Sequence, residues 1–129
     1  MKFIADTRAF IWFITDSEQL SPKAKTLLEA SESDRVLSVA SVWEMAIKTS
    51  LGKLSFNKPL EQFLPEQLSL NYFRVLDISV EHALRVAGLP LAHRDPFDRM
   101  IVAQALTEGL PILSNDSALD AYGIQRLWQ

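Results

Sequence analysis

Cysteine is absent from the 129 residues of this chain. Without cysteine the protein can form no disulfide, no thiolate metal site and no thiol nucleophile. A chain without disulfides fits a reducing compartment, and we therefore expect a cytoplasmic protein. Glycine is scarce as well, with four residues, and no repeat, low-complexity tract or linker rich in glycine and serine interrupts the chain.

Long hydrophobic runs are also missing. No apolar segment reaches the roughly 20 residues that a membrane-spanning helix needs. The opening segment MKFIAD meets a charge too early for the core of a signal peptide. We therefore expect no membrane partner.

An excess of positive charge is the third feature that the chain lacks, because its formal net charge is -3. This value argues against indiscriminate adhesion to nucleic acid. A bound divalent ion would offset part of the negative charge locally, so a nucleic-acid substrate is not excluded.

What the chain does have is hydrophobic and charged residues in globular proportions, 48% and 22% respectively. At this length they fit one domain spanning residues 1–129 with a substantial core. Apolar runs alternate with segments of helical periodicity. We expect strands at 2–5, 35–39, 73–78, 110–113 and 124–128, and helices beginning near Thr7, after Ser21, after Ser41, near Pro59 with a bend or break at Pro65, after Ser79, at Pro96 and at Ser117.

Strands that alternate with helices predict an α/β fold, a three-layer α/β/α sandwich with a central parallel sheet. In such sheets ligands bind beyond the carboxyl ends of the strands. Acidic side chains at that edge are therefore the first residues to consider as a site.

The stretch HRDPFDR, residues 93–99, departs furthest from ordinary globular sequence. Asp95 followed by Pro96 is typical of an N-cap and first helical residue, and Gly109 is a natural left-handed end. Asp98 then lies in the first turn of this helix. It either faces a ligand or interacts with the helix dipole and the capping residue.

Asp6 and Asp116 each follow a predicted strand. Asp6 lies at a strand-to-helix junction, where an aspartate is also a common N-cap. Asp116 lies just beyond a short strand that ends at Ser114. Both positions are at the edge where α/β folds bind ligands.

Glu44 is expected in the first turn of a helix that follows the second strand. Ser41 and Glu44 have the spacing of a capping box, and Glu44 and Lys48 the spacing of a surface ion pair. These are the structural alternatives to a functional role. The helix is expected to bury the apolar residues Trp43, Ala46, Ile47 and Leu51. His82 lacks a second ligand at a suitable spacing and is expected only to pack.

Four carboxylates, Asp6, Glu44, Asp98 and Asp116, thus fall at one edge of the predicted sheet. Carboxylates that converge without a cation repel one another, and oxygen ligands without cysteine favour Mg²⁺ or Mn²⁺ over zinc. Such a site suits hydrolysis of a phosphodiester by metal-activated water. Ser114 could support a carboxylate or a water from outside the ligand set.

These residues resemble the PIN-domain family, and specifically the ribonuclease toxins of VapC type found in bacterial toxin-antitoxin pairs. The matching segments are FIADT, SVASVWEMAIK with LGKL, HRDPFDR running on to Gln104-Ala105, and LSND. The resemblance implies that Asp6, Glu44, Asp98 and Asp116 bind the metal and carry the catalysis, with Ser114 supporting them. Arg8 is a departure, because a histidine is common there in this subgroup, and it leaves the substrate contacts open.

The resemblance further implies Mg²⁺-dependent cleavage of RNA, a homodimer and a cognate antitoxin whose tail blocks the acidic pocket. Four basic residues are candidates for binding phosphates, with ordinary solvated charge as the alternative: Arg94, Arg99, Lys48 and Lys53. Trp12, Phe13 and Trp43 could face the antitoxin or a second subunit, although core packing is the expected role of Trp43.

Three other classes of protein can be compared with the same residues. A phosphatase like the haloacid dehalogenases needs a second aspartate two residues after Asp6, where this chain has Arg8. A receiver-like signalling domain needs an adjacent acidic pair and a late lysine, and neither is present. In a non-catalytic PIN-like dimerisation or interaction module, the carboxylates would only cap helices.

Overall fold

The computed structural model describes all residues from 1 to 129 and contains one five-stranded sheet. Its strands are β1 (Lys2–Ala5), β2 (Asp34–Ser38), β3 (Phe73–Leu76), β4 (Ile112–Leu113) and β5 (Arg126–Leu127). They lie in the order β3-β2-β1-β4-β5, and every neighbouring pair is parallel. The predicted parallel sheet is confirmed.

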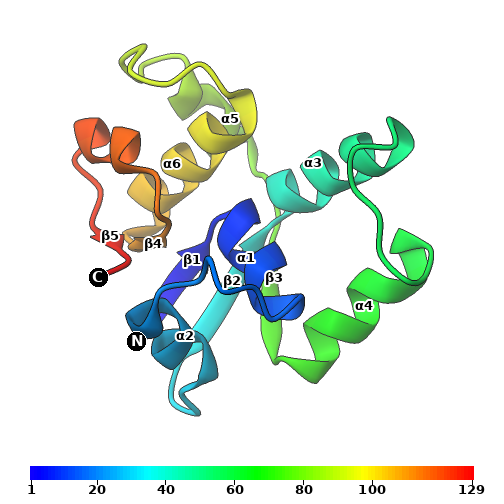
Figure 1. The fold of residues 1–129 in the computed structure, drawn as a ribbon. Helices are drawn as coiled ribbons and strands as arrows, with labels where there is room; N and C mark the ends of the chain where they lie inside the picture. Colours follow the sequence, from blue (N-terminus) through cyan, green and yellow to red (C-terminus); the bar gives the residue numbers. More distant parts are fainter.

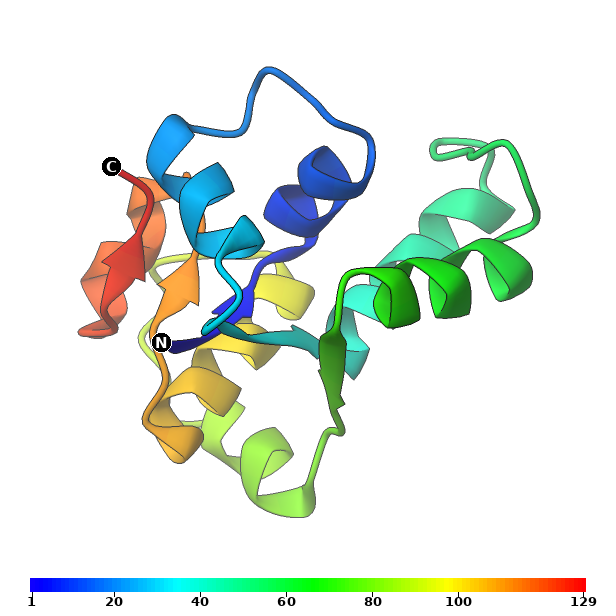
Figure 2. The same ribbon diagram turned by 90° about the horizontal axis from the view of Figure 1, so that it is seen from below.

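Helices cover both faces of this sheet. They are α1 (Thr7–Ile14), α2 (Pro22–Glu29), α3 (Val39–Ser50), α4 (Leu60–Leu70), α5 (Val80–Val86) and α6 (Pro96–Glu108), with the 3₁₀ helix η1 at Ser117–Tyr122. Figure 2 shows α1 and α2 on one face and α5 and α6 on the other. Helices α3 and α4 extend from the β3 side of the molecule (Figure 1). The predicted three-layer α/β/α sandwich is confirmed.

The core follows from the alternation of side chains along each strand. Ile4, Val36 and Ile112 are buried against α6 and η1. Phe3 and Leu113, which are adjacent to Ile4 and Ile112 in β1 and β4, point the other way and pack on α1 and α2. The central strands β1 and β4 are therefore buried on both sides, as parallel strands usually are, whereas the edge strand β3 is partly exposed.

Most helix ends follow the local signals in the sequence. Asp95 accepts hydrogen bonds from the amides of Phe97 and Asp98, and Pro96 is the first residue of α6. Gly109 ends that helix with a φ of 67°, which a residue without a Cβ adopts most easily. Ser21 caps α2 and Ser79 caps α5, as expected.

Helix α3 departs from the expectation in both its start and its buried face. Ser38, not Ser41, is the N-cap, because its Oγ accepts from the Ala40 amide at 2.9 Å and the helix follows β2 without a loop. Glu44 therefore lies in the second turn. The buried side carries Ala40, Ser41, Glu44 and Met45.

The predicted apolar face of α3 is largely exposed. Trp43 is 59% exposed and Leu51 62% exposed, and Ala46 is exposed too. The expected core packing of Trp43 was wrong, because α3 turns a polar strip toward the other helices. The Trp43 ring instead packs edge-on against Phe97 at the start of α6, with centroids 5.2 Å apart.

Two further expectations need correction. Pro65 lies inside a continuous α4, since only one amide is lost there and the carbonyl that would accept from it belongs to the exposed Glu61. Strands β3, β4 and β5 are shorter than their apolar runs, because Leu110, Ile124 and Ile78 pack against the core from loops.

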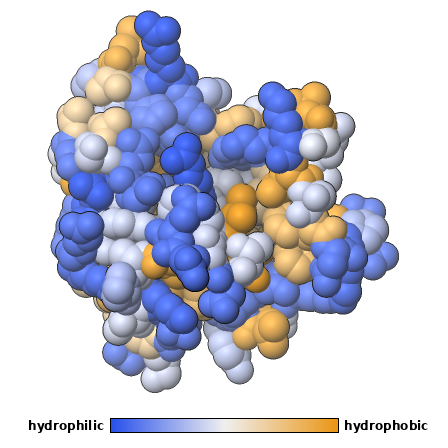
Figure 3. All heavy atoms as spheres, viewed as in Figure 1, coloured by the Kyte–Doolittle hydropathy of each residue, from blue (hydrophilic) through white to orange (hydrophobic).

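No helix of the structure combines the length and the hydrophobicity needed to cross a bilayer. In the space-filling view most of the visible face is hydrophilic, and hydrophobic atoms show between α1 and α4 (Figure 3). A small core of four buried residues joins α1, β2, α3 and α4, with partly buried neighbours around it: Phe10, Leu37, Met45 and Leu64.

Candidate functional site

The strand register aligns three polar residues at the carboxyl edge of the sheet. Ala5 of β1 pairs with Leu37 of β2 on one side and with Leu113 of β4 on the other. The next residues along these strands are Asp6, Ser38 and Ser114. β2 and β3 lie on one side of β1, and β4 and β5 lie on the other side. The order of the strands thus changes direction between β1 and β4, and such switch points are where open α/β sheets bind ligands.

A small polar pocket of about 120 Å³ lies at this edge. No hydrophobic residue lines it, and all four carboxylates singled out from the sequence do. The lining residues are Asp6, Thr7, Arg8, Glu44, Lys48, His93, Asp95, Asp98, Asn115 and Asp116. The fold thus brings together side chains that are up to 110 positions apart in the chain, from Asp6 to Asp116.

Asp6 is both a helix cap and a pocket residue. One carboxylate oxygen, Oδ1, accepts from the Ala9 amide at 2.8 Å and caps α1. The side chain is 7% exposed, and burial raises its pKa, while a hydrogen bond from Ser114 acts in the opposite direction. The capping role is therefore real, and it occupies only one of the two oxygens.

Asp98 does not cap α6, because Asp95 does. Burial raises the pKa of Asp98 to about 7, and the nearby negative charges of Asp95, Asp6 and Glu44 raise it further. His93 acts in the opposite direction and lowers this pKa. A carboxyl group in this environment ionises reluctantly. A cation in the pocket would reverse that tendency.

Glu44 is 6% exposed and reaches the pocket from the second turn of α3. Lys48, one turn further on, places its Nζ 2.6 Å from Glu44 Oε2. The ion pair expected from the sequence is thus present, but at the wall of the pocket. Beside it, Thr7 Oγ1 donates to Ser41 Oγ at 2.8 Å and joins α1 to α3.

Asp116 and His93 meet at the mouth of the pocket. Asp116 Oδ1 caps η1 by accepting from the Ala118 amide at 3.0 Å. Its Oδ2 lies 2.8 Å from His93 Nε2, which is also 3.2 Å from Asp98 Oδ2. Partial burial raises the pKa of Asp116, but the hydrogen bonds from His93 and Ala118 outweigh it, and the net pKa lies below the ordinary value.

Ser114 is fully buried behind these acids. Its Oγ accepts from the Asp116 amide at 3.0 Å, and its hydroxyl hydrogen-bonds Asp6. Ser114 thus contacts two of the four acidic residues, in the position that a supporting residue would need.

His93 was not predicted as a site residue from the sequence, and neither were Thr7 and Asn115, which also line the pocket. His93 belongs to the unusual 93–99 stretch but has no helical or strand periodicity that would indicate its direction. The only local signal is its place two residues before the cap Asp95, whose amide donates to His93 Nδ1 at 3.1 Å.

Of the four basic residues considered for substrate binding, only Lys48 lines the pocket. Arg99 turns away and donates to the carbonyl oxygens of Pro90 and Val86, at 2.7 and 3.2 Å. Arg94 and Lys53 are exposed and do not line the pocket. Arg8, the departure noted in the sequence, does line it and adds a positive charge beside Asp6.

The donor atoms in the pocket fit a divalent cation. One ligand atom each from His93, Asp98 and Asp116 lie within 4.8 Å of one another. Asp6 and Glu44 line the same small pocket without belonging to this closest set. Carboxylate oxygens without sulfur are the donors that Mg²⁺ and Mn²⁺ prefer.

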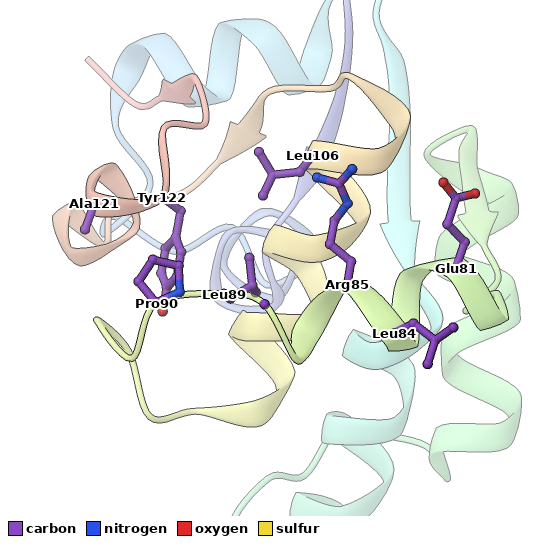
Figure 4. A pocket seen from close by; sticks show the side chains of 9 residues that line it. Glu81, Leu84, Arg85, Leu89, Pro90, Leu106, Ala121 and Tyr122 are labelled. Atoms are coloured by element: carbon purple, nitrogen blue, oxygen red, sulfur yellow. The ribbon is translucent and has the colours of Figure 1, made fainter.

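A wider pocket of about 640 Å³ lies between α5, α6 and η1 (Figure 4). Five of its nine lining residues are hydrophobic, and Glu81 is its only carboxylate. Tyr122 and Pro90 lie together at one end of it. This pocket offers no convergent acidic donors, and it is separate from the polar pocket.

A doubly covered parallel sheet with an acidic pocket at its carboxyl edge defines an α/β protein with a candidate metal site. The sequence pattern of the PIN domain matches residues 3–125. The chain therefore belongs to the PIN domain family. A comparison with curated protein sequences found no match.

Three solved structures illustrate the same fold. VapBC2 from Rickettsia felis, bound to a promoter DNA fragment, superposes with a TM-score of 0.71 at 16% identity over 100% of both chains. FitAcB from Neisseria gonorrhoeae gives 0.66 at 21% identity, covering 98% of this chain and 96% of that one. DNA-bound VapBC from Salmonella typhimurium gives 0.66 at 19% identity, covering 98% and 97%.

Proposed function

We propose that this protein is a Mg²⁺- or Mn²⁺-dependent endoribonuclease that acts as the toxin of a toxin-antitoxin pair. One observation carries the proposal: Asp6, Glu44, Asp98 and Asp116 line a single pocket without a hydrophobic residue. Membership of the PIN domain family and the sequence resemblance to VapC-type toxins support it.

The carboxylates would hold the metal. When bound, a divalent cation supplies an activated water and stabilises charge on the phosphate. Asp98 and Asp116 each contribute an oxygen to the compact group of possible ligands, and Asp6, which uses Oδ1 to cap α1, lines the same pocket. Ser114 would keep Asp6 and Asp116 in place.

The positive charges at the rim would position the RNA backbone. Lys48 and Arg8 line the pocket, and cationic side chains are the usual contacts to phosphate oxygens. The exposed Arg94 and Lys53 would act further from the cleaved bond. Arg99 already donates to backbone carbonyls, which favours a structural role for it.

The proposed partners, an antitoxin and a second copy of this chain, are inferred by analogy with the similar structures. The similar structures include VapBC and FitAB, and one is a toxin-antitoxin complex from Klebsiella pneumoniae. By analogy, we propose a cognate antitoxin whose tail covers the acidic pocket, and a homodimer of this chain. A small reading frame directly upstream would support the antitoxin, and a toxin that cleaves cellular RNA would act in the cytoplasm.

One alternative has structural support. Asp6 and Asp116 both cap helices, as a non-catalytic PIN-like interaction module would require. In that case the pocket carboxylates would be dispensable for any activity. Arg8 occupies the place where a phosphatase like the haloacid dehalogenases needs its second aspartate, so that alternative gains nothing from the structure.

The test is cleavage of single-stranded and structured RNA by the purified protein. We expect cleavage with Mg²⁺ or Mn²⁺, none in EDTA, and recovery when metal is returned. Asp98→Asn should reduce the cleavage rate at least 100-fold, on the order of the loss of one metal ligand. Asp16→Asn, which removes an exposed carboxylate, is the matched control. Cleavage in EDTA, or an active Asp98→Asn protein, would contradict the proposal.

A further inference from the structure

The His93 ring bridges the carboxylates of Asp98 and Asp116, the two acidic residues that form the compact group of possible ligands with it. Its Nε2 lies 2.8 Å from Asp116 Oδ2 and 3.2 Å from Asp98 Oδ2. The other ring nitrogen, Nδ1, accepts from the Asp95 amide at 3.1 Å. A nitrogen that accepts carries no hydrogen, so the ring hydrogen is on Nε2 and points at the carboxylates.

This arrangement is incompatible with a cation held by the same two oxygens. The Nε2 hydrogen and a cation would occupy the same space between Asp98 and Asp116. For His93 to ligate the cation itself, Nε2 would need a free lone pair and Nδ1 would need the hydrogen. The Asp95 amide would then face a donor instead of an acceptor.

The backbone near His93 is held by hydrogen bonds that do not involve the His93 ring. Arg99 donates to the carbonyls of Pro90 and Val86, and the His93 amide donates to the Tyr122 hydroxyl at 2.9 Å. Leu91 is 88% exposed, and the residues on either side of His93 are exposed as well. The backbone is therefore anchored, and the His93 side chain, which is 18% exposed, lies next to exposed residues.

We propose that His93 is an exchangeable cap on the metal site, which competes with a divalent cation for Asp98 and Asp116 and swings into solvent when the cation binds. This inference rests on the proposed function, because it concerns the same site, and it adds a regulatory element. A site whose competent form is only partly populated binds its ligand with a lower apparent affinity. His93 thus sets the cation concentration at which the protein becomes loaded.

The two histidines of the chain allow a direct test by NMR of the full-length protein with ¹⁵N-labelled imidazole rings. His82 is the internal control: it is 3% exposed, its Nδ1 accepts from the Ser79 amide, and its Nε2 lies 2.9 Å from Glu108. On titration with Mg²⁺, which is diamagnetic, the Nε2–H signal of His93 should shift and broaden through exchange with water. The signals of His82 should stay in place.

Calorimetry of Mg²⁺ binding supplies the second measurement. His93→Ala should bind Mg²⁺ about fivefold more tightly than the original protein, since the ring no longer competes for Asp98 and Asp116. His93→Gln, whose amide can still donate to the carboxylates, should have an affinity for Mg²⁺ between those of His93→Ala and the original protein.

The outcomes separate this inference from the proposed function. Saturation with Mg²⁺ without any change at His93, or weaker binding by His93→Ala, overturns the cap and leaves the metal site intact. A protein that binds no Mg²⁺ overturns both. Absence of RNA cleavage by a protein that shows the expected shifts overturns the nuclease and leaves the cap standing.

Discussion

Ser38 donates a 2.5 Å hydrogen bond to Gln104 Oε1 across the buried contact between the start of α3 and the middle of α6. Both side chains are fully buried. Gln104 also donates from Nε2 to the Asp77 carbonyl at 3.2 Å, just beyond β3. One amide therefore joins α6, which carries Asp98, to the carboxyl ends of β2 and β3.

Replacing Gln104 by alanine should destabilise the protein through this junction. The Ser38 hydroxyl and the Asp77 carbonyl would each lose a buried partner, and a cavity would form. We expect the free energy of unfolding to fall by roughly 2 to 4 kcal/mol, measured by urea denaturation. Gln62→Ala, on the exposed face of α4, should change it by less than about 0.5 kcal/mol. Equal effects of the two substitutions would show that the junction is unimportant.

The raised pKa of Asp98 predicts how stability depends on pH in EDTA. The folded pKa is about 7 against an ordinary value of 3.8, so the folded state holds a proton that the unfolded state releases. Between these values the free energy of unfolding should fall as pH rises, by roughly 2 to 4 kcal/mol in total. The raised pKa of the buried Asp6 acts in the same direction.

Asp98→Asn should flatten that pH dependence and raise the melting temperature at pH 8, because the reluctantly ionised group is gone. Asp16→Asn is again the control, since Asp16 is 93% exposed and asparagine tolerates its positive φ. If Asp98→Asn instead unfolds the protein at every pH, the main role of Asp98 is structural.

Divalent cations should stabilise the folded protein, because they bind the carboxylates only when the fold has assembled them. At a Mg²⁺ concentration 100 times the dissociation constant, the gain is about 2.7 kcal/mol, which differential scanning calorimetry would record as a higher melting temperature. NaCl at matched ionic strength should not reproduce it. A gain that persists in Asp98→Asn would place the bound cation elsewhere.

Lys48 and Lys53 should differ in their contribution to RNA binding. Lys48 lines the pocket and Lys53 does not. Lys48→Gln, which keeps a donor for Glu44, should raise the KM for RNA several-fold. The KM should also depend less on salt concentration, since one phosphate contact is lost. Lys53→Gln should leave both nearly unchanged. The reverse ranking, from initial rates at two salt concentrations, would mean that RNA approaches from the end of α3.

The sequence alone determined the order of the elements, the parallel sheet and the four acidic positions at its edge. These depend on local signals: two-sided apolar strands, the caps Ser21, Ser79 and Asp95, and the left-handed end at Gly109. Because parallel strands end at the same edge, Asp6 and Asp116 could be placed there without coordinates.

Tertiary structure decided which way the side chains point. Trp43 is exposed and Glu44 is buried on the same helix. The side of α3 that packs against α1 and α6 is the buried one, and it is not the most hydrophobic side of the helix. Arg99 donates to backbone carbonyls near the 87–95 loop, and His93 enters the pocket from that loop. The direction of His93 could not be predicted, because a loop has no periodicity from which a direction can be inferred. The contacts of such residues exist only once distant segments have packed.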